Sequence, residues 1–196
     1  MNTLHKYRQF IREVDRECTR LFNAHKREIR CRKGCGECCE DISVLPVEIA
    51  SIRAWLARHK KVRSKCKPRD GDSNHNRTRS CIFIHPDKAS CTIYSARPFI
   101  CRVHGLPLRY AIEEYDQRGE RTRQKDPSWQ LVWCEKNFST TEETGGPAFF
   151  PAYMTVNMEE YYSRLTAINS AFLEERARNG SEILTFPLSS AWNFLS

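Results

Sequence analysis

The chain has 196 residues, a formal net charge of +8 and a mean hydropathy of −0.64. This length can bury an apolar core without disulfides, and no apolar run approaches the roughly 18 residues that a membrane-spanning helix needs. Charged residues interrupt the first positions, where a secretory signal would be apolar, so we expect an unexported, cytoplasmic protein. In a reducing compartment, ten cysteines favour metal ligation over a disulfide framework.

The segment 3–30 carries apolar residues at steps of three and four, with charged residues between them. This period predicts a long amphipathic helix, the N-terminal part of the protein. Gly34 and Gly36 follow the helix and allow the backbone to turn beside the cysteines. The apolar positions are Leu4, Tyr7, Phe10, Ile11, Val14, Cys18, Leu21, Phe22, His25 and Ile29.

A second helix is predicted from Pro46, a common first-turn residue, to about Lys60. The segment 61–79 that follows is polar and strongly basic, and it shows no period. Because it also contains Pro68 and Gly71, we expect a mobile basic loop there.

Two short runs rich in β-branched and aromatic residues begin at Cys81 and Cys91, and they predict the strands of a small hairpin. The segment 153–179 has helical spacing and stops at Gly180, which predicts a C-terminal helix. The apolar tail after it is expected to pack on the core or on a partner. The predicted fold class is α-rich with minor β. We expect one domain over residues 1–196, in which 31–134 form the cysteine core and 135–196 the C-terminal helix and tail.

The strongest motif is a group of four cysteines within nine residues: Cys31, Cys35, Cys38 and Cys39. The Cys35-x2-Cys38 spacing is typical of a metal knuckle. Adjacent Cys38 and Cys39 do not fit one tetrahedral mononuclear site easily, because neighbouring side chains diverge in most backbone conformations. Two metals or a cluster fit the motif better.

The remaining candidate ligands lie further along the chain: Cys81, Cys91, Cys101 and Cys134. Together the eight thiols could form two four-sulfur sites, one iron–sulfur cluster plus a zinc site, or a cluster with cysteines left for chemistry. The sequence leaves these alternatives open, and the cofactor is predicted to be zinc or iron, including an iron–sulfur cluster.

The order and wording of these motifs resemble the YkgJ-type cysteine-cluster family, over about residues 28–105. The resemblance implies a zinc- or iron-chelating domain in which Cys31, Cys35, Cys38, Cys39, Cys81, Cys91 and Cys101 are cluster residues. The segment Tyr94-Ser-Ala-Arg97-Pro98-x2-Cys101-Arg102 supplies the motif neighbours. The family is similar to the cysteine-rich part of flagellin lysine N-methylases, and this similarity implies an iron–sulfur centre. Cys134 rests on spacing and hydrophobic context alone.

Other residues near the motif are expected to have roles other than metal ligation. Cys18 lies on the apolar stripe of the first helix and is expected to be a core thiol, whereas Cys66 is expected to be exposed in the basic loop. A lone histidine in a loop is more often not a ligand, which applies to His85 and His104. Arg97 and Arg102 are expected to have structural roles in preference to binding an anionic substrate.

The sequence leaves three functions open. The first is a metal-binding protein, and the second is an enzyme that modifies a protein or peptide substrate, as the methylase resemblance suggests. The third is a zinc-stapled module that binds nucleic acid or another partner. The basic loop lacks interleaved aromatic residues for base stacking, so nucleic-acid binding is disfavoured.

Overall fold

The structure is a computed structural model that describes residues 2–32, 34–36, 38–40, 42–63, 81–85, 90–113, 118, 128–138, 150–179 and 186–187. The chain divides into two compact units. Unit 1 comprises Met1–Val14, Arg32–Arg102 and Leu165–Ser196, and unit 2 comprises Asp15–Cys31 and Val103–Arg164. The helices dominate and the sheets are small, which confirms the predicted α-rich fold with minor β.

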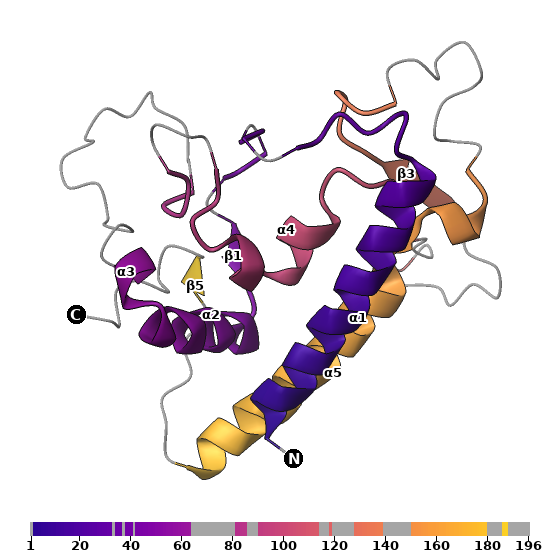
Figure 1. The fold of residues 1–196 in the computed structure, drawn as a ribbon. Coiled ribbons are helices and arrows are strands. Elements are labelled where there is room, and N and C mark those ends of the chain that lie inside the picture. The colour runs from indigo at the N-terminus through magenta and orange to yellow at the C-terminus, as the bar shows by residue number, and fades with distance from the viewer. Residues whose placement is uncertain are drawn as a thin grey trace. The chain divides into compact units, whose positions relative to one another are not determined.

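The two predicted long helices are present: α1 spans Thr3–Ala24 and α5 spans Met158–Arg178, although α5 begins after the predicted start at residue 153. Each contributes residues to both units. In unit 1 the two helices run antiparallel (Figure 1), and the backbone N–H of Thr3 donates to the Glu175 carboxylate at 3.1 Å. This contact satisfies one of the free N–H groups at the start of α1.

The first helix is shorter than its apolar period predicts, because it ends at Ala24 and not near residue 30. His25 begins a turn, and its Nε2 lies 2.8 Å from the carbonyl oxygen of Met154. The His25 ring is buried against Phe138 and Phe150. The apolar period therefore continues past the helix because these residues are packed, although the backbone is no longer helical.

In unit 1, α2 spans Pro46–Arg58 and α3 spans Lys60–Arg63. Pro46 occupies the first turn, and the Glu48 carboxylate reaches back to accept from the Leu45 N–H at 3.0 Å. This contact is one half of a capping box. The helix agrees with the prediction, whereas the first residues of the expected basic loop, 61–63, are helical in α3 and the rest of it lies outside the described residues.

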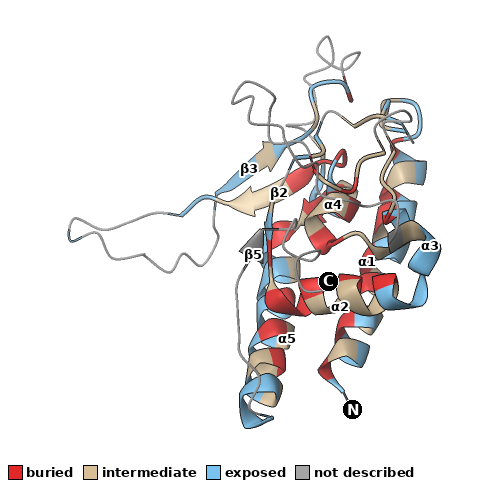
Figure 2. Cartoon of the chain, turned by 90° about the vertical axis from the view of Figure 1, so that its left-hand side faces the viewer, coloured by how far each residue is buried: buried red, intermediate tan, exposed pale blue. Residues whose placement is uncertain are grey.

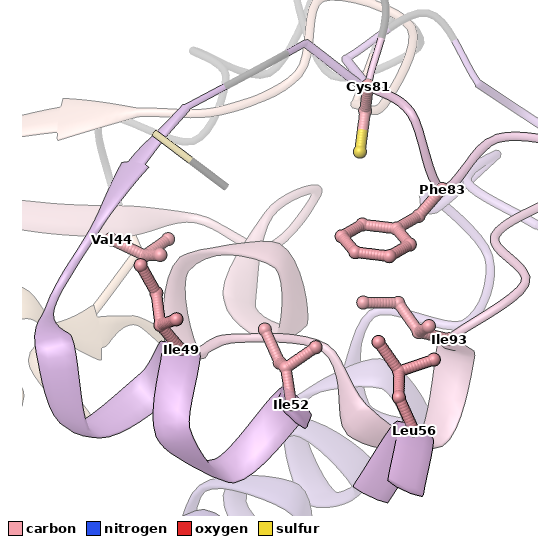
Figure 3. Close-up of a cluster of buried hydrophobic side chains, with 7 residues drawn as sticks. All are labelled: Val44, Ile49, Ile52, Leu56, Cys81, Phe83 and Ile93. Atoms are coloured by element: carbon pink, nitrogen blue, oxygen red, sulfur yellow. The ribbon is translucent and has the colours of Figure 1, made fainter. Parts of the chain in front are cut away.

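The core of unit 1 is an apolar cluster packed on one face of α2 (Figure 3). Residues of one face of α2 meet Phe83 and Ile93 from the segments around Cys81 and Cys91. Phe83 is fully buried. The members of the apolar cluster are Val44, Ile49, Ile52, Leu56, Cys81, Phe83 and Ile93.

The predicted hairpin of unit 1 is present in reduced form. Ile84 and Cys91 form an isolated antiparallel bridge, and Thr92 N donates to Phe83 O at 2.8 Å. A 3₁₀ turn, η1 (Tyr94–Ala96), and the short helix α4 (Phe99–Val103) follow it. The described part of the apolar tail, β5 (Phe186–Pro187), pairs antiparallel with β1 (Ser43–Val44), so this part returns to unit 1 as expected.

Unit 2 contains a three-stranded sheet in the order β3-β2-β4, which the sequence did not predict. The strands are β2 (Leu108–Ala111), β3 (Trp129–Val132) and β4 (Val156–Asn157), and β4 follows the 3₁₀ turn η4 (Ala152–Met154). β2 pairs antiparallel with β3 and parallel with β4. The edge strand β3 is largely exposed (Figure 2). Its weak alternation of buried and exposed residues explains why no strand was predicted there.

Candidate metal centre

Three cysteines of unit 1 border the apolar cluster. Cys81 is a buried member of it, and Cys39 and Cys91 pack against it. The Cys81 N–H donates to the carbonyl oxygen of Cys39 at 3.0 Å, and Cys91 is bridged to Ile84. Figure 3 shows the Cys81 sulfur directed toward the Phe83 ring. The backbone pairing thus brings together three thiols that lie far apart in the sequence.

Cys101 lies in α4, and the residues of α4 up to Arg102 belong to unit 1. The side chain of Arg102 donates from Nε to Arg97 O at 2.8 Å and from its terminal nitrogen to Ser95 O at 2.8 Å. These bonds fix the turn that precedes α4. Burial, followed by the nearby charges of Cys81 and Cys91, raises the pKa of Cys101 to about 12.

Cys38 and Cys39 are adjacent but differ in environment, because Cys38 is exposed and Cys39 is half-buried. A hydrogen bond with Cys38 raises the pKa of Cys39 well above its ordinary value, and burial and the charges of Cys38, Cys81 and Cys91 add to this effect. Thiols close enough to raise one another's pKa are costly to ionise together unless a cation is present. We call Cys38, Cys39, Cys81, Cys91 and Cys101 the clustered thiols.

The N-terminus of α2 is joined to this site through a buried carboxylate. Glu48 accepts from Phe99 N at 2.9 Å in addition to Leu45 N, and Tyr7 OH lies 3.4 Å from the same carboxylate. Burial is the main cause that raises the pKa of Glu48, although these hydrogen bonds oppose the increase. Glu48 thereby holds the start of α4, two residues before Cys101.

Two further predicted ligands, Cys31 and Cys134, lie in unit 2. Both are half-buried. The buried side chain of Asn137 accepts from the Cys31 N–H at 3.1 Å, and the backbone N–H of Asn137 donates to Cys134 O at 2.8 Å. Cys35 belongs to unit 1, in a turn closed by its own N–H, which donates to Arg32 O at 2.9 Å.

The family comparison adds to these positions. Residues 30–135 match the model described as "CxxCxxCC: Putative zinc- or iron-chelating domain", which is more than half of the chain. The chain belongs to this CxxCxxCC family. The match includes Cys134, which the motif resemblance had left out. Comparisons with curated proteins and with solved structures find no match.

The donor set fits the metals in the CxxCxxCC description, because thiolates are preferred ligands of both zinc and iron. The nine cysteines that the structure describes form no disulfides. Within the described residues, no three Cys, His, Asp or Glu side chains already converge as a metal-binding group. The chemistry of the donors therefore fits, and closure of a site would require the sulfurs to draw together, as when metal binding is coupled to folding.

The other candidates have distinct places in this CxxCxxCC domain. Cys18 is buried in α1, which confirms it as a core thiol, and Cys66 lies outside the described residues. His85 is half-buried and His104 is exposed. Arg102 makes the structural contacts that were expected, and the Arg97 guanidinium carbon lies 3.7 Å from the centre of the exposed Tyr94 ring.

Sequence reasoning missed three residues that position the cysteines. Glu48 could have been found as an acidic residue in the first turn after Pro46, which is a capping pattern. Gly105 has a φ of +95°, and Asn137 bonds to backbone far away in the sequence. Neither of these two residues carries a local signal.

Across the described residues, no helix is long and apolar enough to cross a membrane.

Proposed function

We propose that this CxxCxxCC domain binds zinc or iron through the clustered thiols, with Cys35 as a further donor. The proposal is supported above all by the position of Cys39, Cys81 and Cys91 at one apolar cluster. Cys38 is close enough to raise the pKa of Cys39, and Cys81 and Cys91 are close enough to raise that of Cys101. A bound cation would replace the thiol protons and remove the repulsion between thiolates. The protein's own residues would hold the sulfurs, and the apolar cluster would limit the access of water to one side.

An iron–sulfur cluster is a finer form of this proposal. The adjacent Cys38 and Cys39 support more than one metal atom, because one tetrahedral ion does not easily accept two neighbouring side chains as well as Cys81 and Cys91. A reducing compartment such as the cytoplasm would keep these thiols available. No contact of the described residues specifically favours a peptide-modifying or a nucleic-acid-binding function.

The test is anaerobic purification followed by elemental analysis, visible absorption and an assay for acid-labile sulfide. We expect bound zinc or iron, and sulfide together with visible absorption if the iron is in a cluster. Folded protein that holds no metal, even after reconstitution with zinc or with ferrous iron and sulfide, would refute the proposal.

Matched variants test which thiols are responsible. Cys81→Ser and Cys101→Ser should each lower the metal content, because oxygen is a poorer ligand for these metals at such sites. Cys18→Ser is the control, since Cys18 is a buried thiol of α1 outside the clustered thiols. Equal loss of metal in the control and in the test variants would contradict the assignment.

A further inference from the structure

Unit 2 contains a buried asparagine whose side chain bonds to two separate backbone segments. The Oδ1 atom of Asn137 accepts from Arg30 N at 2.8 Å and from Cys31 N at 3.1 Å, and Nδ2 donates to Gly105 O at 2.5 Å. The side chain is 1% exposed. Buried amides with several backbone partners hold those partners in a single arrangement, since each lost bond leaves a polar group unsatisfied.

The same residue also closes the turn at Cys134. The backbone N–H of Asn137 donates to Cys134 O at 2.8 Å, and the next residue, Phe138, donates to Glu28 O at 3.0 Å. The segment that leads into Cys31 is therefore bonded to the segment that follows Cys134 by both side-chain and backbone contacts. The short segment 134–138 thus fixes the backbone at both Cys31 and Cys134, which are distant in sequence.

Gly105 shows that this packing is close. A Cβ atom added at Gly105 would lie 3.3 Å from Cys31 Cβ, 3.4 Å from Cys31 Sγ and 3.5 Å from Asn137 Nδ2. Its φ of +95° also favours glycine. The backbone after α4 thus passes so near Cys31 that a side chain at residue 105 would press on that cysteine, which limits the positions open to its sulfur.

The conformation of Phe138 is a second, independent sign that the segment is tightly constrained. Phe138 has a φ of +64°, which is uncommon for an aromatic residue and persists only where the surroundings fix it. Its ring is 2% exposed and packs edge-on against His25, with centroids 5.3 Å apart. The Phe150 ring lies at the same distance from Phe138. Aromatic packing on one side and hydrogen bonds on the other therefore hold residues 134–138.

We propose that Asn137 is a positioning residue that holds Cys31 and Cys134 as a pair of thiols facing a common ligand, separately from the clustered thiols. The ligand is a thiophilic metal ion, and this part of the proposal rests on the proposed function. The pairing itself does not, because it follows from contacts within unit 2. We call Cys31 and Cys134 the paired thiols.

The first experiment tests the pairing in metal-free, reduced, full-length protein. Dibromobimane links two neighbouring thiols, and peptide mass spectrometry identifies the linked residues. We expect a Cys31–Cys134 link in the natural protein and loss of most of it in Asn137→Ala. Asn137→Asp should retain more of the link, because a carboxylate can still accept from Arg30 and Cys31.

Asn169→Ala is the matched control for a merely structural effect. Asn169 is also buried, and its Oδ1 accepts from the Val47 N–H at 3.2 Å in unit 1. This variant should keep the Cys31–Cys134 link. Absence of the link in the natural protein, or an equal loss in Asn169→Ala and Asn137→Ala, would overturn the pairing.

The second experiment tests the ligand with zinc and with ferrous iron. Each metal should protect the paired thiols from alkylation, and Asn137→Ala should weaken that protection about tenfold while the clustered thiols stay protected. Protection of the clustered thiols without protection of the paired thiols would overturn the inference and leave the proposed function standing. A cross-link without any metal binding would refute the proposed function and the ligand role, and would leave the pairing intact.

Discussion

The clustered thiols of unit 1 and the paired thiols of unit 2 are held by different kinds of interaction. Cys81 lies within an apolar cluster, and Cys39 and Cys91 pack against it. In unit 2 the Cys31 N–H instead donates to the side-chain amide of Asn137 beside Gly105, and the Cys134 carbonyl accepts from the backbone N–H of Asn137. The comparison shows that one cysteine motif can be supported both by hydrophobic burial and by directional polar contacts.

The difference has electrostatic consequences. In unit 1 a hydrogen bond with Cys38 raises the pKa of Cys39 and burial raises the pKa of Cys101, and neighbouring sulfurs add to both effects, so these thiols resist ionisation until a cation binds. In unit 2 the hydrogen bonds fix the position of the backbone. Their loss would therefore displace the sulfur atoms of Cys31 and Cys134 more than it would change the charge on those atoms. Variants of each kind should therefore affect one set of thiols and leave the other unchanged.

The largest effect is expected from Phe83→Ala, which removes a fully buried ring from the apolar cluster. The free energy of unfolding should fall by about 3–5 kcal/mol, because the ring leaves a cavity. In metal-free protein, Cys81 should be alkylated faster while Cys31 keeps its rate. Urea unfolding and mass spectrometry of alkylated peptides provide the two measurements.

Phe138→Ala is the reciprocal control, since Phe138 is an equally buried ring in unit 2. It should increase the alkylation rate of Cys134 and not that of Cys81. If both variants expose all the thiols alike, the two sets are not independently supported.

A smaller effect is expected from Glu48→Gln. One amide oxygen cannot replace both carboxylate oxygens, so Leu45 N or Phe99 N would lose its acceptor, at a cost of about 1–3 kcal/mol. Because the pKa of Glu48 is raised in the folded state, the folded protein binds more protons than the unfolded chain. Glu48 should therefore contribute stability at low pH that is lost as the pH rises through its raised pKa.

Urea unfolding across that pH range measures both effects. Glu48→Gln should remove this part of the pH dependence, whereas Glu174→Gln, an exposed change on α5, should leave both stability and pH dependence unaltered. If the free energy of unfolding of the natural protein does not fall over this pH range relative to that of Glu48→Gln, Glu48 is not the source of the pH dependence.

The smallest effect is expected from Gly105→Ala. Alanine is strained at a φ of +95°, and its Cβ would press on Cys31, so the free energy of unfolding should fall by about 1 kcal/mol or more. Gly34→Ala is the control, since exposed Gly34 has a nearly identical φ of +96°. Only Gly105→Ala should also lower the yield of the Cys31–Cys134 cross-link. Equal yields in the two variants would show that the close contact at Gly105 does not position Cys31.

Parts of the fold and of the site could be predicted because their signals are local. Helix α2 is marked by Pro46 and by its apolar spacing, and it begins where predicted. The strands β2 and β3 were not predicted, since Trp129 and Val132 remain exposed and the alternation that marks a half-buried strand is weak. The end of α1 was missed because His25 remains buried after the helix has ended.

The sequence by itself determined the helical character of α1 and α5 and the thiol chemistry of the CxxCxxCC segment, because periodicity and ligand type are properties of short stretches. Only the tertiary structure decided which cysteines share a unit and which residues position them. Asn137 and Cys31 are 106 residues apart, and Glu48 and Phe99 are 51 apart. A buried amide or carboxylate takes its role from the backbone groups that folding brings to it, and no local pattern encodes those partners.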